Sequence, residues 1–506
     1  MKKISLICAL WFLLASPKAH NIYYISTTGN DQNAGTSPAA AWRTITHALA
    51  SASPVEAGDI VYVQAGLYAG EHILVEKSGT ANHPLVIQGY RQVPGDDPGF
   101  AFDYGDTPDA SRMPLLDGGD RSQGIGIDLN GAQYVQWHNF QITRYAYGIM
   151  DHSHLADRHV LLDHIYLTVF GDTSDDYSGK AVELISSDNT IRRCLVVNAS
   201  AQGIYVEGDR NLIEDCKVYC DDTTSDRAAM DYYIVVYFGN HNTIRNCYTE
   251  RIGDLPHYGH GIGVKGDAQY NSFENCTAVN FRDEAFYVRH RGAQHNTFRH
   301  CHARGVTEDA TGFIVRDGAS YNTFDACTVS DCKRGIMFED SSEDGGAQYC
   351  GRYNVFRNCI LTNNETGIDF NDYEEDTDVD GNSFYNCVFY GGTTLINVER
   401  NNYNNQMVNC VVSGYQQLKT ESNGYTLYFD FSYSDFFNNG FSSPSGTGNH
   451  AADPQFIDTA NHDFHLRPGS PCIDTGTANG APVTDFDGNP RPAGSAPDIG
   501  AYEYRP

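Results

Sequence analysis

The sequence predicts an all-β fold, a single-stranded, right-handed parallel β-helix, and two repeated patterns lead to this prediction. The first is the hexapeptide Asn-x-apolar-x-x-Cys, which occurs nine times with Cys-to-Cys steps of 22, 31, 29, 25, 26, 32, 28 and 23 residues. Its cysteines are Cys194, Cys216, Cys247, Cys276, Cys301, Cys327, Cys359, Cys387 and Cys410. A repeat of this length without helical periodicity is typical of a solenoid, because one coil is too small to bury its own apolar face.

The second pattern is a run of alternating apolar residues before most of these hexapeptides, as in GIYVEGD from Gly203 and GIGVKGD from Gly261. A period of two predicts strands with one buried face. Each coil should therefore hold a strand, a turn with the Asn and a second strand with the Cys. We expect the asparagines to form an internal amide ladder and the nine cysteines to be buried free thiols. A disulfide remains open among the cysteines outside this column, Cys220, Cys332, Cys350 and Cys472.

The chain divides into a predicted signal peptide at residues 1–20, the β-helix at residues 21–446 and a turn-rich segment at residues 447–506 that closes the same domain. Two lysines and an apolar run open the chain, and this run is too short for a bilayer span of about 20 helical residues. We therefore expect a secreted or periplasmic protein without a membrane span. Residues 42–50 predict a short helix that caps the amino-terminal end, where an exposed strand edge would invite strand addition.

The formal net charge is −30 and the sequence pI is about 4.8. Such a surface argues against nucleic acid as a partner, because the phosphate backbone attracts basic proteins. An acidic protein can still bind a polyanion where its few basic residues gather. We expect a monomer whose partner is an acidic polysaccharide or oligosaccharide.

Equivalent places in consecutive coils become vertical neighbours, roughly 4.8 Å apart. The residue that follows the buried stretch of the strand motif reads, coil by coil, Glu207, Tyr237, Lys265, Arg289, Arg316, Glu339 and Asn371. Three successive cations repel one another unless an anionic ligand binds there. They could instead pair with acids on adjacent coils, such as Glu207 or Asp317. As substrate-binding residues we predict Arg316, Tyr237, His260, Tyr258, Tyr287, Arg291 and Glu207.

β-Elimination on a uronic acid suits such a group of cations. The proton on C5 lies next to the carboxylate, and cations must neutralise this carboxylate before the proton can leave. Neighbouring cations disfavour a charged ammonium group, so a Lys among them can act as the base. An Arg, Tyr or His nearby can assist the leaving oxygen.

The run GVKGDAQYNSFENC and the following AFYVRHRGAQHNTF resemble the site of family 6 polysaccharide lyases, the alginate lyases and chondroitinase B. The resemblance covers about two coils. It implies that Lys265 is the base, that Arg289 is the acid or leaving-group partner, and that His290 contacts the substrate at the catalytic centre. That family often places acidic calcium ligands just before the Lys, where this chain has Tyr258 and His260.

The amino-terminal segment, and an acidic turn at residues 282–284 one coil after Lys265, resemble family 9 pectate lyases. This resemblance also implies a Lys base, together with Ca²⁺, for which Asp231 and Asp254 are the nearest candidate ligands. The fragment Asp485-x-Asp487-Gly-Asn489 resembles part of a calcium loop, although a role in closing the solenoid is favoured there.

The sequence thus predicts a secreted polysaccharide lyase that cleaves a uronate polymer such as alginate or pectate. Three alternatives stay open. A C5-epimerase would share the proton abstraction, and a non-catalytic surface protein would use the groove only for binding. A glycoside hydrolase would need two carboxylates about 5 to 10 Å apart. The candidates for this pair are Glu339, Asp340, Asp369 and Asp372, or Glu207 with Asp231.

Overall fold

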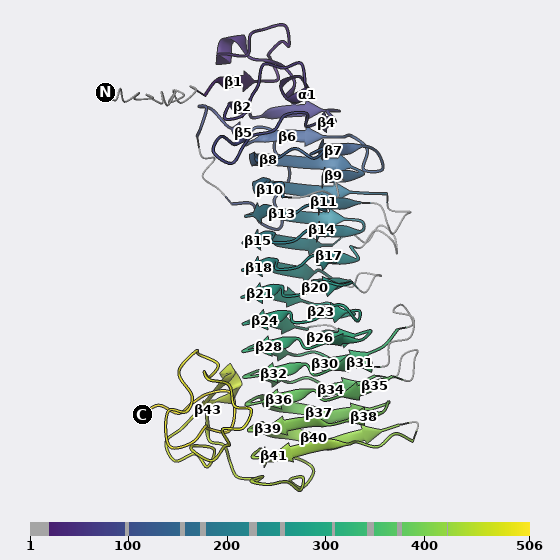
Figure 1. Ribbon diagram of the computed structural model, residues 1–506, viewed down its shortest axis with the longest axis vertical. Coiled ribbons are helices and arrows are strands. Elements are labelled where there is room, and N and C mark those ends of the chain that lie inside the picture. The colour runs from purple at the N-terminus through teal and green to yellow at the C-terminus, as the bar shows by residue number, and fades with distance from the viewer. Residues whose placement is uncertain are drawn as a thin grey trace, which may run out of the picture.

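The chain winds into stacked coils of parallel strands, and this confirms the predicted β-helix (Figure 1). Almost all of the strand pairings are parallel, and each coil pairs with the coil before it and the coil after it. Three parallel ladders run along the stack. The computed structural model describes residues 20–96, 101–151, 157–172, 179–221, 230–253, 259–305, 309–341, 349–371, 377–422 and 424–506.

The first ladder carries the alternating apolar motif of the sequence. The outward-facing side chains of its middle strands form the candidate site. Its strands are β4 (Ile73–Leu74), β7 (Ile125–Asp128), β9 (Tyr147–Asp151), β11 (Lys180–Leu184), β14 (Gln202–Val206), β17 (Tyr232–Tyr237), β20 (His260–Lys265), β23 (Glu284–Arg289), β26 (Thr311–Arg316), β30 (Arg334–Glu339) and β34 (Thr366–Phe370).

The second ladder follows the asparagine turn in each coil. Its strands are β1 (Ile22–Ile25), β2 (Ile60–Gln64), β5 (Leu85–Tyr90), β8 (Val135–Tyr145), β10 (Leu161–Phe170), β12 (Thr190–Arg192), β15 (Leu212–Glu214), β18 (Thr243–Arg245), β21 (Ser272–Glu274), β24 (Thr297–Arg299), β28 (Thr323–Asp325), β32 (Val355–Arg357), β36 (Ser383–Tyr385), β39 (Asn405–Val408) and β41 (Phe429–Ser432). The long strands β8 and β10 continue into the third ladder.

The third ladder begins just after the cysteine column. Its strands are β3 (Gly66–Ala69), β6 (Pro114–Asp117), β13 (Leu195–Ala199), β16 (Lys217–Cys220), β19 (Tyr248–Arg251), β22 (Thr277–Val279), β25 (His302–Arg304), β29 (Thr328–Ser330), β33 (Ile360–Thr362), β37 (Val388–Val398), β40 (Val411–Glu421) and β42 (Asp435–Phe437). A short parallel sheet comprises β27 (Ala319–Ser320), β31 (Tyr349–Arg352), β35 (Asp378–Asp380) and β38 (Asn402–Tyr403), and β43 (Phe456–Asp458) forms an antiparallel hairpin with β44 (Asp463–Leu466).

The repeated asparagines form the predicted amide ladder from Asn189 to Asn405. The backbone N–H of each one donates to the side-chain oxygen of the Asn in the next coil, at 2.7–3.0 Å. The side-chain amide also bonds the turn, as in the 3.0 Å bond from Asn296 Nδ2 to the carbonyl oxygen of Ala268. Because these asparagines are buried, the loss of one of these hydrogen bonds would leave a buried polar group without a partner, and this would destabilise the fold. The ladder therefore fixes the register of the coils.

The nine motif cysteines are buried free thiols, as predicted. Each motif Sγ contacts a backbone carbonyl of the preceding coil, such as Ile244 O at 3.6 Å from Cys276 Sγ. The possible disulfide among the other four is not formed, because each of them lies buried as a free thiol. Their local partners differ: the Cys220 sulfur accepts the backbone N–H of Met230, whereas the Cys472 thiol lies 3.5 Å from Asp435 Oδ2.

The amino-terminal end is covered by a short helix, α1 (Ile45–Leu49), preceded by the 3₁₀ turn η1 (Pro38–Ala40). Ile45, Ala48 and Leu49 are buried against the first coils, so the capping helix is present but shorter than predicted. Among the residues that the structure describes, no helix is long and apolar enough to cross a membrane.

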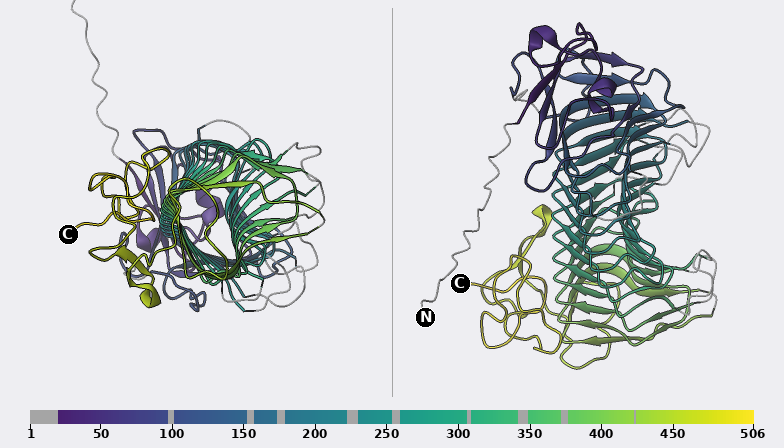
Figure 2. Two further views of the ribbon diagram at one scale, coloured as in Figure 1. Left: turned by 90° about the horizontal axis from the view of Figure 1, so that it is seen from below. Right: turned by 45° about the horizontal axis from the view of Figure 1, so that its top comes forward.

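The carboxyl-terminal segment lies beside the last coils, as both views in Figure 2 show. Its residues Phe464, Ile499 and Tyr502 join an apolar cluster with Val388 and Val411 of the third ladder. The segment also contains the 3₁₀ turn η3 (Thr459–Asn461). It therefore packs mainly on the flank of the β-helix, and not only across its end.

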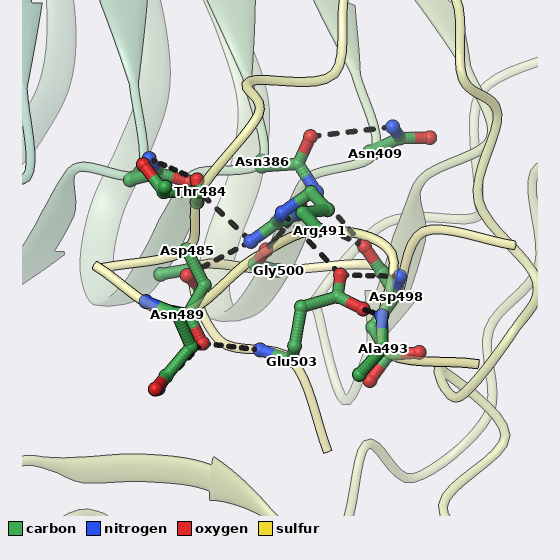
Figure 3. A network of polar contacts seen from close by, with 12 residues as sticks. Asn386, Asn409, Thr484, Asp485, Asn489, Arg491, Ala493, Asp498, Gly500 and Glu503 are labelled. Carbon is green, nitrogen blue, oxygen red and sulfur yellow. Dashed lines mark hydrogen bonds and ion pairs between the residues drawn. The ribbon is translucent and has the colours of Figure 1, made fainter. Parts of the chain in front are cut away.

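A buried polar network fastens this segment to the coils (Figure 3). The guanidinium of Arg491 lies 3.3 Å from Glu503 Oε1, and both side chains are fully buried. Its Nη2 donates to the carbonyl oxygen of Ala501 at 3.0 Å. Asp485 accepts bonds from Asn489 and from the backbone N–H of Glu503. The oxygens of Asp485 therefore hold this turn of the segment together.

Candidate active site

A cavity of about 620 Å³ lies on the outer face of the first ladder. Strands β11, β14, β17, β20, β23 and β26 all contribute to it, so consecutive coils build one site from residues far apart in the chain. Its lining consists of Lys180, Ala201, Gln202, Tyr205, Asp231, Tyr232, Val235, Tyr237, His260, Lys265, Asp283, Arg289 and Arg316.

The predicted column of cations is present in the lining of this cavity. Tyr237 pairs in register with Lys265, Arg289 pairs with Arg316, and Arg316 pairs with Glu339. Lys265 is half-buried, whereas Arg289 and Arg316 are almost completely buried. The three cations thus reach one cavity from three consecutive coils.

The hydroxyl group of Tyr232 is the point at which two of these cations meet. Lys265 Nζ donates to Tyr232 Oη at 3.0 Å, and Arg289 Nη1 donates to the same oxygen at 3.2 Å. The Tyr232 ring stacks on His260 with ring centres 4.4 Å apart and contacts Tyr287 edge-on. Its hydroxyl is therefore held in place between a possible base and a guanidinium.

Two acids partly neutralise the arginines. Asp317 Oδ2 lies 3.5 Å from the Nε atoms of both Arg289 and Arg316, so the alternative pairing with Asp317 holds in part. Glu339 Oε1 lies 3.2 Å from Arg316 Nη1. Burial, with help from the nearby carboxylates, raises the pKa of Glu339 to about 7 although Arg316 opposes this rise. Near neutral pH, the charge available on Arg316 thus depends on Glu339.

Three carboxylates surround the imidazole of His260. Glu284 Oε1 lies 2.7 Å from Nδ1, whereas Asp283 and Asp231 approach Nε2 at 3.4 and 3.5 Å. Burial alone would lower the pKa of His260, but these carboxylates outweigh it and raise the pKa. Burial raises the pKa of Asp283, helped by Glu284. The carboxylates of this cluster therefore favour the protonated form of the His260 imidazole.

This cluster does not fit the calcium ion that the resemblances imply. His260, Asp283 and Glu284 offer ligand atoms close enough to hold a metal ion, but calcium takes roughly six to eight oxygen ligands and an imidazole lies at the centre of this group. The buried Glu284 carboxylate already has His260, Arg289 and Arg316 as charge partners, and they outweigh the effect of burial to lower its pKa. Of the two predicted ligands, Asp231 belongs to the cluster and Asp254 lies outside the described residues. We derive no step through a metal ion.

Removal of calcium should therefore leave the activity of the protein within about twofold of its untreated value. The expected reason is that protein cations already balance the carboxylates around His260. The measurement is turnover of a uronate polymer after dialysis against a calcium chelator, with a calcium-reconstituted sample as control. A loss of activity that added calcium restores would contradict the metal-free interpretation.

Several other predicted residues lie outside the cavity lining. His290 is in the turn after β23, where its Nδ1 accepts the backbone N–H of Gly266 at 3.2 Å. Arg291 is exposed in the same turn, and Glu207 accepts the hydroxyl of Tyr205. Tyr287 is fully buried and packs edge-on against Tyr232. It therefore supports Tyr232 and does not contact a substrate directly. Tyr258 lies outside the described residues.

The structure adds lining residues that the sequence did not single out. Lys180 and Gln202 extend the cavity toward the amino-terminal coils, and Asp283, from the acidic turn before β23, also lines it. Tyr232 was ambiguous in the sequence, because three tyrosines occur in the same strand. In the structure Tyr232 lines the cavity and its hydroxyl accepts bonds from Lys265 and Arg289, whereas Tyr233 is buried in the core.

The chain matches the family described as right handed beta helix region at residues 160–305 and 232–412. Together these matches span half of the chain. The protein therefore belongs to the right-handed β-helix family. No curated protein matches the chain.

Several solved structures are similar at low sequence identity. The pectate lyase Pel9A is 16% identical with a TM-score of 0.38, and the match covers 96% of each chain. An alginate lyase from Paenibacillus sp. str. FPU-7 is 18% identical with a TM-score of 0.41, covering 55% of this chain and 90% of that one. The lacto-N-biosidase from Eubacterium ramulus is 12% identical with a TM-score of 0.37, covering 85% and 68%. The choice among activities therefore rests on the residues of the site.

Proposed function

We propose that this protein is a polysaccharide lyase that cleaves a uronate polymer by β-elimination in the cavity of the first ladder. The observation that carries the proposal is the convergence of Lys265, Arg289 and Arg316 on one cavity from consecutive coils. A polymer is too large to cross a membrane, so this proposal includes the export that residues 1–20 predict.

The arginines supply the electrostatic part of the reaction. A uronate carboxylate bound against Arg289 and Arg316 would be neutralised, and this stabilises the negative charge that develops when C5 loses its proton. Because both side chains are nearly buried, water screens their charges little. The carboxylate of Asp317 lies next to the Nε atoms of both arginines and so helps to keep their side chains in place. Arg289 Nη1 still reaches the tyrosine that lines the cavity.

Lys265 supplies the base. Its ammonium group lies over the rings of Tyr232 and Tyr237, with Nζ 5.2 and 6.0 Å from the ring centres, and it opens into the cavity. In its neutral form it removes the C5 proton. The electron pair then forms the C4–C5 double bond as the bond from C4 to the glycosidic oxygen breaks.

The hydrolase alternative has less support, because its candidate carboxylates already have partners. Glu339 pairs with Arg316, and Glu207 accepts the hydroxyl of Tyr205. Asp369 accepts bonds from Arg334 and Asn397. The cavity carboxylates Asp231 and Asp283 both contact Nε2 of His260, whereas a hydrolase needs its two acids on opposite sides of the scissile bond. Asp340 does not line the cavity, and Asp372 lies outside the described residues.

The test of the proposal is an ultraviolet assay of the purified protein on uronate polymers. Elimination creates an unsaturated sugar that absorbs near ~235 nm, which neither hydrolysis nor binding produces. We expect this absorbance to rise with at least one polymer. New reducing ends without the absorbance would indicate a hydrolase, and the absence of any cleavage would indicate an epimerase or a binding protein.

The affinity for an anionic substrate should fall as the pH rises through about 7, because Glu339 ionises and then competes for Arg316. Below that pH the carboxyl group is protonated and no longer competes with the substrate for the charge of Arg316. We expect KM to rise about fivefold between pH 6 and pH 8, which is roughly 1 kcal/mol. In Glu339→Gln this rise should be absent, and the same rise in both proteins would contradict the role of Glu339.

A further inference from the structure

The direct hydrogen bond between Lys265 and Tyr232 connects a base with a second group that can carry a proton. The Nζ and Oη atoms are 3.0 Å apart, so a proton can pass between them in one step. Arg289 contacts the same oxygen from the next coil at 3.2 Å. Both side chains line the cavity.

We propose that Tyr232 is the catalytic acid that protonates the leaving glycosidic oxygen, on the same face of the sugar as the base Lys265. This inference rests on the proposed lyase function and specifies its stereochemistry. Lys265 takes the proton from C5, and the C5–H electron pair becomes the double bond to C4. The bond from C4 to the oxygen breaks, and that oxygen takes the proton of Tyr232. The ammonium of Lys265 then returns a proton to the phenolate, and both groups are restored.

Tyr232 suits the acid role better than Arg289, to which the family resemblance gave it. A guanidinium does not lose its proton at neutral pH, whereas a phenol does so near ~10 in water. Two cationic donors on one oxygen stabilise the phenolate that forms when the proton leaves. Arg289 is then the group that stabilises charge on Tyr232 and on the substrate.

The contact between base and acid also selects a class of substrate. Because Nζ and Oη touch, they act on C5 and on the C4 oxygen from the same side of the ring. Mannuronate and glucuronate units linked through an equatorial C4 oxygen have the C5 proton and that oxygen on the same side. Galacturonate and guluronate units have them on opposite sides. We therefore infer that the polymer contains mannuronate or glucuronate at the cleaved position.

The variant Tyr232→Phe tests the acid role, because it removes the hydroxyl and keeps the ring that stacks on His260. We expect kcat to fall by about 10²- to 10⁴-fold with little change in KM. Exchange of the C5 proton with deuterium from solvent, followed by NMR, should persist in this variant and be lost in Lys265→Met. The matched control is Tyr270→Phe, which removes a hydroxyl from an exposed tyrosine outside the cavity lining. Near-normal cleavage by Tyr232→Phe, or loss of the exchange together with cleavage, would overturn the acid role.

The substrate class is tested with the wild-type protein on four polymers: polymannuronate, polyglucuronate, polyguluronate and polygalacturonate. We expect the unsaturated product from one or both of the first pair and at least 100-fold slower cleavage of the second pair, roughly the contribution of one misplaced catalytic group. Preferred cleavage of polyguluronate or polygalacturonate would overturn the same-face inference and leave the lyase proposal intact. Cleavage of none of these and of no other uronate polymer would overturn both.

Discussion

The variant Lys265→Met should lose at least about 10³-fold in kcat while its fold stays intact. Methionine keeps most of the side-chain volume but cannot accept a proton from C5. It also removes the donor to Tyr232 Oη. Because Lys265 is half-buried at the end of β20 and methionine can still pack against the rings of Tyr232 and Tyr237, the free energy of unfolding should change little. The measurements are the ultraviolet assay and a thermal unfolding curve.

Two further variants separate the loss of the base from the loss of a charge. Lys265→Arg keeps the positive charge but cannot act as a base at neutral pH, so it should bind the polymer and fail to cleave it. Lys217→Met removes a lysine that pairs with Asp103 on the third ladder, outside the cavity lining, and should cleave normally. Normal turnover by Lys265→Met or Lys265→Arg would remove Lys265 from the reaction.

The variant Arg491→Met should destabilise the carboxyl-terminal segment by about 3–5 kcal/mol. It leaves the buried carboxylate of Glu503 without its cation and also removes the bonds to the carbonyl oxygens of Gly500 and Ala501. Because the segment packs on the flank of the coils, it should open before the β-helix unfolds. The measurement is hydrogen exchange, which should speed up in residues 484–503 and stay slow in the coils.

The controls for this variant use the same segment. Arg505→Met removes an exposed arginine that bonds the carbonyl oxygen of Pro490, and its effect should stay below about 0.5 kcal/mol. Adding Glu503→Gln to Arg491→Met should recover part of the loss, since no buried charge then lacks a partner. Equal effects of Arg491→Met and Arg505→Met would show that the buried pair does not hold the segment.

The fold could be predicted from the sequence because the same hexapeptide, with its Asn and Cys, recurs from coil to coil. The Asn of the hexapeptide bonds its equivalents in the neighbouring coils, so one column of identical residues fixes the register. Once the register is fixed, Lys265, Arg289 and Arg316 must share one column, as the structure shows. The candidate site followed from the repeat.

The part played by Tyr232 could not be predicted, because strict alternation fails near the start of strand β17. From Tyr237, a period of two places Val235 and Tyr233 outward. In the structure Tyr233 and Ile234 both face the core, and Tyr232 faces the cavity. The same order occurs in β23, where Ala285 and Phe286 belong to the core. In both strands one extra residue near the start faces inward, and strict alternation of apolar residues does not predict it.

Interactions across coils also limited what the sequence could show. The pairing of Asp317 with two arginines, and of His260 with three carboxylates, depends on side-chain directions that spacing alone does not fix. The resemblance to pectate lyases suggested calcium ligands at Asp231 and Asp254, but spacing could not show the histidine that lies at the centre of the acidic group. Spacing likewise could not show that Nδ1 of His290, a predicted substrate contact, accepts the backbone N–H of Gly266.

The most direct measurement is a crystal structure of Lys265→Met with a bound uronate oligosaccharide. We predict that one carboxylate lies against Arg289 and Arg316, with C5 facing residue 265 and the C4 oxygen facing Tyr232. A sugar bound on another face of the coils, or with its carboxylate turned away from both arginines, would contradict elimination at this site.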